Sequence, residues 1–326
     1  MTADRPSDSW NGTAALHVLL LGAAAGGGFP QWNCGCAGCR AARRGDAPRS
    51  GQVSLALSAD GENWVLVNAS PDILSQIADT PELHPRGLRE TPLRGVILTN
   101  GEIDAVAGLL SLREGAAFEL WATDAVHGTL ATNSIFNVLK PERVPRRVLV
   151  PEEVFVPRLP DGREIGLTIR PFAVPGKPAW YVEEVKAAEE GDTLALEIEA
   201  GGRRAYVFTA CAEITEAIRA RIRGADLVFF DGTLWRDDEM IRAGLAQKTG
   251  ASMGHVSVSG PEGAIARLEG FGIGQKVFVH INNSNPILLP DSPERREAEA
   301  AGWEIGQKGA RYTLCTTSPS IPHRGN

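Results

Sequence analysis

Three cysteines lie within six positions of the chain, in the order Cys34-Gly-Cys36-Ala-Gly-Cys39. Thiolates at this spacing can surround one tetrahedral zinc ion, and the intervening glycines let the backbone fold closely around it. A fourth ligand would have to come from a distant segment, and histidine, aspartate or cysteine would each serve. Because three thiolates leave zinc a weak Lewis acid, the pattern favours a structural zinc over a catalytic one. The alternative is a loop of reduced cysteines without a metal.

Other polar side chains follow apolar segments, at points where we expect buried strands to end. The candidates are Asn100, Glu102 and Asp104 after segment 95–99, Asp231 after segment 226–230, His280 near the end of segment 277–281, and His255 in a loop rich in glycine and serine. Polar groups at alternating positions beyond a strand can be aimed at one point above the edge of a sheet. Taken alone, each residue also has a simpler explanation: a helix cap for the aspartates, a hydrogen-bonded core histidine, or a surface loop.

The elements that must position these residues occur twice in the same order. Each half shows a hairpin, a helix and a buried strand, at 53–67, 71–78 and 95–99 in the first half and at 194–209, 213–223 and 226–230 in the second. Ser70 is the expected N-cap of the first of these helices, and segment 103–113 has helical spacing. The segments around Val65 and Tyr206 also align with an offset of 141. This order predicts two similar β-rich halves that face each other, with helices outside, rather than a doubly wound parallel sheet.

The segment 141–178 contains eight prolines among mixed polar and apolar residues. We interpret it as a surface connection between the two halves, not as a hinge between independent domains. The chain is thus expected to form one domain over residues 1–326, with an ordered core at about 16–314 and polar tails at both ends.

Composition excludes several classes of function. The chain has 326 residues, is 43% apolar and carries a formal charge of −7, which argues against a protein that mainly binds nucleic acid or an anionic membrane. No run approaches the roughly 18 apolar residues of a membrane-spanning helix. No Gly-Lys-Ser/Thr or GxGxxG motif follows glycines 26–28, which excludes the common nucleotide-binding loops. The first ten residues lack the basic start of a signal peptide, so a cytoplasmic protein is expected.

Four segments closely resemble a known family, the B proteins of pyrroloquinoline quinone (PQQ) biosynthesis, which belongs to the metallo-β-lactamase fold superfamily. They are LLGAAAGGGFPQWNCGCAGC at 20–39, LTNGEIDAVAGLLSLREG at 98–115, MGHVSVSG at 253–260 and FVHINNSNP at 278–286. The resemblance covers nearly the whole chain. It implies an αββα sandwich of two similar halves, with a metal site at one edge of the sheets.

The chain departs from the superfamily's metal-binding signature, His-x-His-x-Asp-His. Asn100, Glu102, Asp104 and Ala105 occupy the conserved positions, so only the aspartate is kept. A hydrolase with two zinc ions needs more ligands than remain. The resemblance further indicates that His280 is retained and that His255 matches a motif histidine of related tRNA-processing nucleases. One carboxylate and two histidines with open positions are the ligand set of non-haem iron(II) that activates dioxygen.

We therefore hypothesise that Asp104, His255 and His280 hold Fe²⁺, with Glu102 or Asp231 as a further ligand or acid/base group. The resemblance implies O₂-dependent hydroxylation of the tyrosine ring in the cross-linked Glu-Tyr intermediate from the PQQ precursor peptide. Two other functions stay open: a non-catalytic carrier or transport factor for PQQ or its precursor, and a metal-dependent hydrolase. Such ligands are anionic, so a binding site should gather arginines, for which the candidates are Arg40, Arg43, Arg44 and Arg113.

Overall fold

The computed structural model describes residues 15–182 and 187–315. The tails predicted at the two ends lie outside these residues, except for Cys315 at the end of the last strand.

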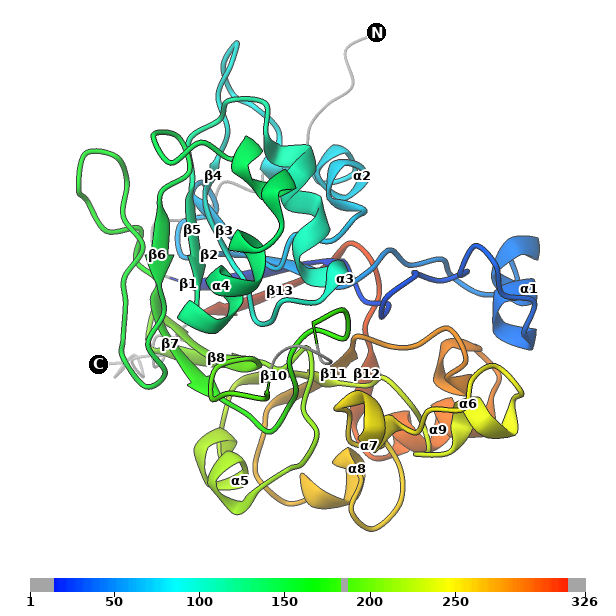
Figure 1. The fold of residues 1–326 in the computed structure, drawn as a ribbon. Helices are drawn as coiled ribbons and strands as arrows, with labels where there is room; N and C mark the ends of the chain where they lie inside the picture. Colours follow the sequence, from blue (N-terminus) through cyan, green and yellow to red (C-terminus); the bar gives the residue numbers. More distant parts are fainter. Residues whose placement is uncertain (1–14, 183–186, 316–326) are drawn as a thin grey trace, which may run out of the picture.

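Two β-sheets face each other in the middle of the molecule (Figure 1). The first has the strand order β13-β1-β2-β3-β4-β5-β6 and the second the order β12-β11-β10-β9-β8-β7. The strands of the first sheet are β1 (Ala15–Gly22), β2 (Ser54–Ser58), β3 (Trp64–Val67), β4 (Leu93–Ile97), β5 (Glu119–Ala122), β6 (Arg146–Val148) and β13 (Ala310–Cys315). Those of the second are β7 (Thr168–Ala173), β8 (Leu194–Ala200), β9 (Arg203–Val207), β10 (Leu227–Asp231), β11 (Gln275–Val279) and β12 (Trp303–Ile305).

Helices cover the outer faces of both sheets (Figure 1). On the first sheet lie α2 (Ile73–Ala78), α3 (Ile103–Val106) and α4 (Asp124–Ala131), with 3₁₀ turns at Pro81–Leu83, Ala107–Leu112 and Ser134–Val138. On the second lie α5 (Glu216–Ile222), α7 (Gly250–Met253), α8 (Ala264–Arg267) and α9 (Pro293–Ala300), with α6 (Glu239–Arg242) and a 3₁₀ turn at Pro286–Leu288 nearby. The remaining helix, α1 (Ala37–Arg44), lies beyond the sheets at one end of the molecule. No helix among the described residues combines the length and apolarity needed to cross a membrane.

The two halves repeat one another, as the order of elements predicts. In each, an antiparallel hairpin is followed by a helix and two parallel strands: β2–β3, α2, β4 and β5 in the first half, and β8–β9, α5, β10 and β11 in the second. The αββα sandwich of two similar halves is therefore confirmed.

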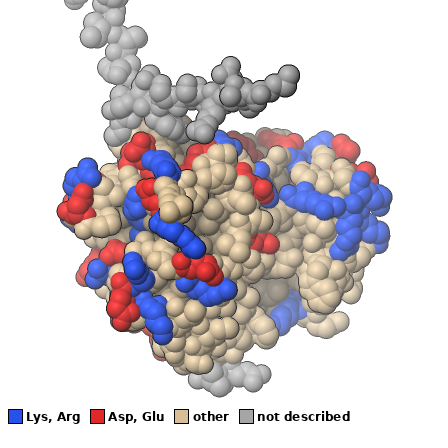
Figure 2. All heavy atoms as spheres, turned by 90° about the horizontal axis from the view of Figure 1, so that it is seen from above, with Lys and Arg blue, Asp and Glu red and all other residues tan. Residues whose placement is uncertain are grey.

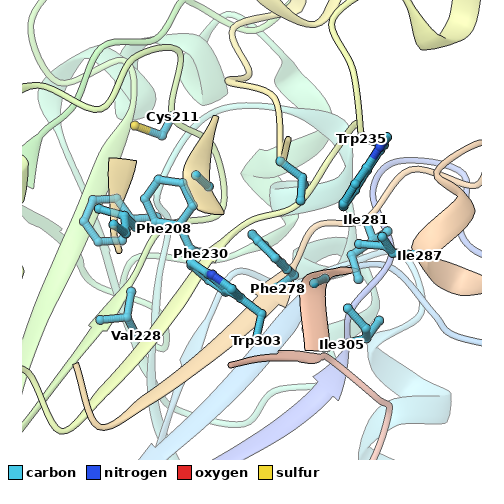
Figure 3. Packing of buried hydrophobic residues seen from close by; sticks show 14 of the residues in the cluster. Phe208, Cys211, Val228, Phe230, Trp235, Phe278, Ile281, Ile287, Trp303 and Ile305 are labelled. Atoms are coloured by element: carbon cyan, nitrogen blue, oxygen red, sulfur yellow. The ribbon is translucent and has the colours of Figure 1, made fainter. Parts of the chain in front are cut away.

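Alternation along the strands separates the buried side chains into layers. On β10, Leu227 and Phe229 face the other sheet, whereas Val228 and Phe230 face the helices. Figure 3 shows this second layer, where the ring of Phe278 stacks on Trp303 at a centroid distance of 3.9 Å. Aromatic residues thus fill the space under the helices directly behind the end of β11.

Three local expectations need correction. The proline-rich segment is not only a surface connection, because it supplies β6 and β7, and Ile169 and Phe172 of β7 are buried. Ser70 does not cap α2, since its hydroxyl donates to Gln76 and the helix begins after Asp72. The helix predicted over 103–113 has one α-helical turn and continues as a 3₁₀ helix.

Candidate metal centres

One edge of the sandwich brings four of the predicted site residues together. Asp104 lies in α3, in the connection that follows β4, and Asp231 is the last residue of β10. His280 comes directly after β11, whose Val279 pairs with Asp231 in a parallel register. His255 follows α7 and reaches the same place. Parallel strands end at a common edge, which explains why residues so far apart in sequence meet here.

The two imidazole rings lie against each other and are held from behind. Their centroids are 4.9 Å apart, with an angle of 21° between the ring planes. Nδ1 of His255 lies 2.6 Å from Oδ2 of Asp231, and Nδ1 of His280 lies 2.7 Å from Oγ1 of Thr233. Nδ1 of His255 thus contacts Asp231, and Nδ1 of His280 contacts Thr233. Nε2 is therefore the nitrogen of each ring that can bind a metal or a substrate.

Asp231 lies completely buried behind the rings. Its oxygens accept hydrogen bonds from the backbone N–H groups of Cys211 (2.9 Å) and Thr233 (3.0 Å) and from the Thr233 hydroxyl (2.6 Å), besides meeting His255. Burial by itself raises the pKa of this carboxyl, but the charge of His255 and the hydrogen bonds outweigh it and hold the pKa below its usual value. Asp231 is therefore an ionised acceptor that fixes the orientation of His255.

His280 faces Asp104 with its other nitrogen, and Nε2 lies 3.0 Å from Oδ2 of that residue. The Thr233 hydroxyl donates to Asp231, so it accepts the hydrogen bond from Nδ1 of His280. If Nε2 of His280 carried no proton, its lone pair and Oδ2 of Asp104 would be two hydrogen-bond acceptors in contact with no donor between them. A cation, either a proton or a metal ion, fits between them.

The protonated form of His280 is accordingly stabilised. Burial lowers the pKa of this ring, but the hydrogen bond to Asp104 and the negative charges of Asp104 and Asp231 outweigh burial and raise the pKa above its ordinary value. His280 also adopts a left-handed backbone conformation, with φ = 53°, which a residue other than glycine seldom takes.

Glu102 lies at the start of α3 and turns toward another segment. Its Oε1 accepts a hydrogen bond from the backbone N–H of Trp180 (3.1 Å), while the Tyr181 hydroxyl donates to the carbonyl of Gly101 (2.6 Å). Trp180 itself is 60% exposed. The loop with Glu102 and Asp104 is thereby tied to a segment that carries an exposed aromatic ring beside the site.

The three cysteines form a second cluster, at the start of α1. Their sulfur atoms lie within 4.8 Å of one another. Sγ of Cys36 caps the helix by accepting from the N–H of Cys39 (3.4 Å). Burial raises the pKa of the Cys36 thiol, but hydrogen bonds from its neighbours outweigh burial and lower it overall, whereas burial and the neighbouring Cys36 raise the pKa of Cys39 to about 11.

An asparagine that the sequence did not single out lies against all three sulfur atoms of this cluster. Nδ2 of Asn283 lies 3.1, 3.7 and 3.4 Å from the sulfur atoms of Cys34, Cys36 and Cys39. Zn–S and Zn–O bonds of ordinary length in a tetrahedral site place the oxygen about 3.6 Å from each sulfur. The two ends of an amide are assigned from their hydrogen bonds, so its oxygen fits the same position. The expectation of histidine, aspartate or cysteine omitted this residue type; the only signal was its place three residues after His280.

The arginines expected to bind an anionic ligand are engaged elsewhere. Arg43 donates to the carbonyls of Gln31 (2.5 Å) and Cys34 (2.5 Å), and Arg40 donates to the carbonyl of Gly35. The other two form ion pairs with a neighbour in the sequence, Arg44 with Asp46 and Arg113 with Glu114. Figure 2 shows one group of basic side chains at the end of the molecule formed by α1, besides others mixed with acidic side chains elsewhere on this face. Arg40 and Arg43 support the cysteine loop, whereas Arg113 lies after the 3₁₀ helix Ala107–Leu112 of the first half.

Comparison with known proteins identifies the family. The model of the β-lactamase superfamily domain matches residues 63–281. Two relatives named coenzyme PQQ synthesis protein B, from Bradyrhizobium diazoefficiens and Rhodopseudomonas palustris, are 57% and 55% identical over 309 residues, covering 92% of this chain and all of theirs.

Solved structures agree with this result. Zn²⁺-bound PqqB from Methylobacterium extorquens is 46% identical and superimposes with a TM-score of 0.87 over 91% of this chain and 100% of its own. A diphosphatase from the PhnP family shares the fold at 19% identity, with a TM-score of 0.63 over 92% of this chain and 98% of its own. The chain belongs to the family of coenzyme PQQ synthesis proteins B, within the β-lactamase superfamily.

Proposed function

We propose that the protein acts in PQQ synthesis as an iron(II)-dependent hydroxylase of the tyrosine ring in the Glu-Tyr intermediate. The names of its relatives support the pathway. The observation that carries the reaction is the pairing of His280 with Asp104 beside the ring of His255. Two histidines and one carboxylate suit non-haem iron(II), and Asn100, Glu102 and Ala105 stand in place of the three signature histidines that a pair of zinc ions would need.

Within this proposal, Asp104 and the Nε2 atoms of His255 and His280 hold the metal. Atoms of Asp231, His255 and His280 lie within 4.8 Å of one another, which makes Asp231 an alternative ligand, whereas Asp104 reaches the site through its contact of 3.0 Å with Nε2 of His280. We favour Asp104, because both oxygens of Asp231 already accept hydrogen bonds in the protein interior. Asp231 and Thr233 then orient the two rings, as outer partners of metal-bound histidines commonly do.

Iron(II), when bound, supplies the capacity to reduce dioxygen, which redox-inert zinc lacks. Placing one oxygen atom in a ring C–H bond converts the other to water and consumes two electrons and two protons from an external reductant. Glu102 stands two residues before Asp104, close enough to His280 for its charge to raise the pKa of that ring, and is the carboxylate that can exchange protons with a bound phenol. The backbone N–H of Trp180 donates a hydrogen bond to Glu102, and the indole ring of Trp180 offers an aromatic surface for the substrate ring.

The cysteine cluster serves a different purpose in this proposal. Cys34, Cys36 and Cys39 hold a structural zinc, with Asn283 as the fourth ligand. Support comes from the sulfur–amide distances and from the zinc found in the related structure from Methylobacterium extorquens. Four protein ligands leave no open position, as is usual for structural zinc.

Anaerobic reconstitution with Fe²⁺ tests the hydroxylase. Oxygen uptake is then followed with the cross-linked Glu-Tyr diamino acid and ascorbate as reductant. We expect substrate-dependent uptake that Asp104→Ala and His280→Ala abolish. His84→Ala, at an exposed histidine on the first half, serves as the matched control and should retain it.

The other functions give distinct results in the same experiment. Tight PQQ binding without oxygen uptake or metal dependence would replace the proposal with a carrier. Turnover with zinc or manganese under strict anaerobic conditions would replace it with a hydrolase. If the Asp104→Ala and His280→Ala variants took up oxygen as fast as the wild type, these residues would not belong to the active site.

A further inference from the structure

A single short segment joins the two candidate metal centres. His280, which faces Asp104, and Asn283, which faces the three sulfur atoms, are three residues apart. The backbone carbonyl oxygen of Asn283 also lies 3.5 Å from Sγ of Cys36. Segment 280–283 is thus in contact with one centre at each end.

This segment is held along its length by backbone hydrogen bonds. The N–H of Ile281 donates to the carbonyl of Ala23 (2.8 Å), and the N–H of Ala25 donates to the carbonyl of Ile281 (2.9 Å). The N–H of Asn282 donates to the carbonyl of Thr233 (3.0 Å), the residue whose hydroxyl binds the His280 ring. A displacement of Asn283 would therefore also shift the backbone of His280 and Thr233, whose hydroxyl orients the His280 ring.

The conformation of His280 makes it sensitive to such a displacement. A non-glycine residue at φ = 53° persists only where its surroundings fix it. The ring must also keep Nδ1 on Thr233 and Nε2 on Asp104 at the same time. Both contacts depend on where the backbone of segment 280–283 is anchored, and the cysteine cluster is the anchor at its far end.

We propose that Asn283, bound to zinc in the cysteine cluster, is a positioning residue for His280, so that occupancy of the cysteine site raises the metal affinity of the Asp104–His255–His280 site. The inference rests on the two metal sites of the proposed function. It adds a thermodynamic linkage between them, which must act equally in both directions.

Titration with Mn²⁺, followed by the EPR signal of the free ion, measures the histidine site alone. Mn²⁺ prefers carboxylate and imidazole ligands, whereas thiolates select zinc. Zinc per chain, measured by elemental analysis after dialysis against a mild chelator, reports the cysteine site. Neither measurement requires a catalytically active enzyme.

Two substitutions of Asn283 are compared with a matched control. Asn283→Ala removes the fourth zinc ligand, and we expect loss of bound zinc together with a fall in Mn²⁺ affinity of about tenfold to a hundredfold. Asn283→Asp keeps an oxygen ligand, so it should retain zinc and stay near the wild-type Mn²⁺ affinity. Asn33→Ala, at an exposed asparagine beside Cys34, should change neither value. If Asn283→Ala does not fold, wild-type protein stripped of zinc provides the same comparison.

Three results would overturn the inference. Asn283→Ala that keeps zinc as wild type does would exclude Asn283 as a ligand. Loss of zinc with unchanged Mn²⁺ affinity would exclude the linkage, and loss of zinc from Asn283→Asp would show that the amide only donates hydrogen bonds to the sulfur atoms. Two baselines separate these results from a failure of the proposed function: Cys34→Ser must lower zinc content and Asp104→Ala must abolish Mn²⁺ binding. If either baseline fails, the proposed function and this inference fall together.

Discussion

Nε2 of His280 lies 3.0 Å from Oδ2 of Asp104, although 176 residues separate them in the sequence. The contact joins the two halves of the sandwich, since Asp104 follows β4 of the first sheet and His280 follows β11 of the second. The pair is therefore both part of the candidate site and a link across the fold.

Replacing Asp104 by asparagine should show how much of the metal affinity depends on the negative charge of this residue and how much on its shape. The amide keeps the volume of the carboxylate, but it offers a weaker neutral ligand and no longer attracts a cation to Nε2 of His280. We expect the Mn²⁺ affinity of Asp104→Asn to fall about a hundredfold or more, beyond the range found for outer partners. EPR titration measures this loss. Wild-type affinity in the variant would show that the metal binds away from Asp104.

Thr233→Val should weaken metal binding without touching a proposed ligand. Valine has nearly the same shape, but it leaves Nδ1 of His280 without its acceptor and removes one of the two donors to Oδ1 of Asp231, which keeps the backbone N–H of residue 233. Unsatisfied buried groups of this kind cost about 1–3 kcal/mol. We expect that loss in urea unfolding and a fall in Mn²⁺ affinity of about tenfold.

The control for this variant is Thr132→Val, an exposed threonine at the end of α4. Its free energy of unfolding should stay within about 0.5 kcal/mol of wild type. Equal metal affinity in Thr233→Val and Thr132→Val would contradict an orienting role for the Thr233 hydroxyl.

Metal binding should release a proton and weaken in acid. Burial lowers the pKa of His280, but Asp104 and Asp231 outweigh burial and raise it above the ordinary value of 6.5, so the ring mostly holds a proton at pH 6 when no metal is bound. A metal ion must displace that proton, and its affinity therefore declines as the pH falls through the raised pKa. Calorimetry at pH 6 in two buffers of different ionisation enthalpy measures the proton released.

The same shift affects the stability of the metal-free protein in the opposite sense. A pKa raised on folding contributes stability that is fully present below the unfolded value of 6.5 and is lost as the pH rises through the folded value. Urea unfolding without metal should thus show this contribution in wild type and not in His280→Gln. Metal binding at pH 6 without proton release would contradict the raised pKa.

Phe278→Ala should destabilise the second half of the molecule. The ring is fully buried and stacks on Trp303, so its removal leaves a cavity under the helices. We expect a loss of about 3–5 kcal/mol in the free energy of unfolding. Leu88→Ala, at a fully exposed leucine, should have almost no effect in the same urea titration. A small loss for Phe278→Ala would mean that the layer collapses around the missing ring.

Much of the fold could be predicted because its signals are local. The repeated order of hairpin, helix and strand needs only nearby residues, and the layered sandwich followed from it. The expectation for segment 141–178 was wrong in part, because the segment connects the halves but also supplies an edge strand to each sheet, and prolines mark loops and edge strands equally well. Here β6 and β7 are the outermost strands of their sheets, where proline is tolerated.

The sites divide in the same way. The cysteine cluster is visible in the sequence because its members span six positions, but Asn283 lies 249 residues from Cys34 and only folding brings it there. Asp231 was predicted as a ligand or acid/base group, because the sequence does not show how deeply a carboxylate at a strand end is buried. Its complete burial and its hydrogen bonds with Cys211 and Thr233 place it behind the histidines.

The first strand, β1, pairs with the last, β13, and both metal centres combine early and late residues of the chain. The thiols at 34–39 leave the ribosome long before Asn283, and Asp104 leaves it long before His280. While the chain is being synthesised, the set of side chains of neither candidate centre is complete until the late residues have been added. Under the proposed function, both complete sets of ligands therefore exist only after Asn283 has been synthesised.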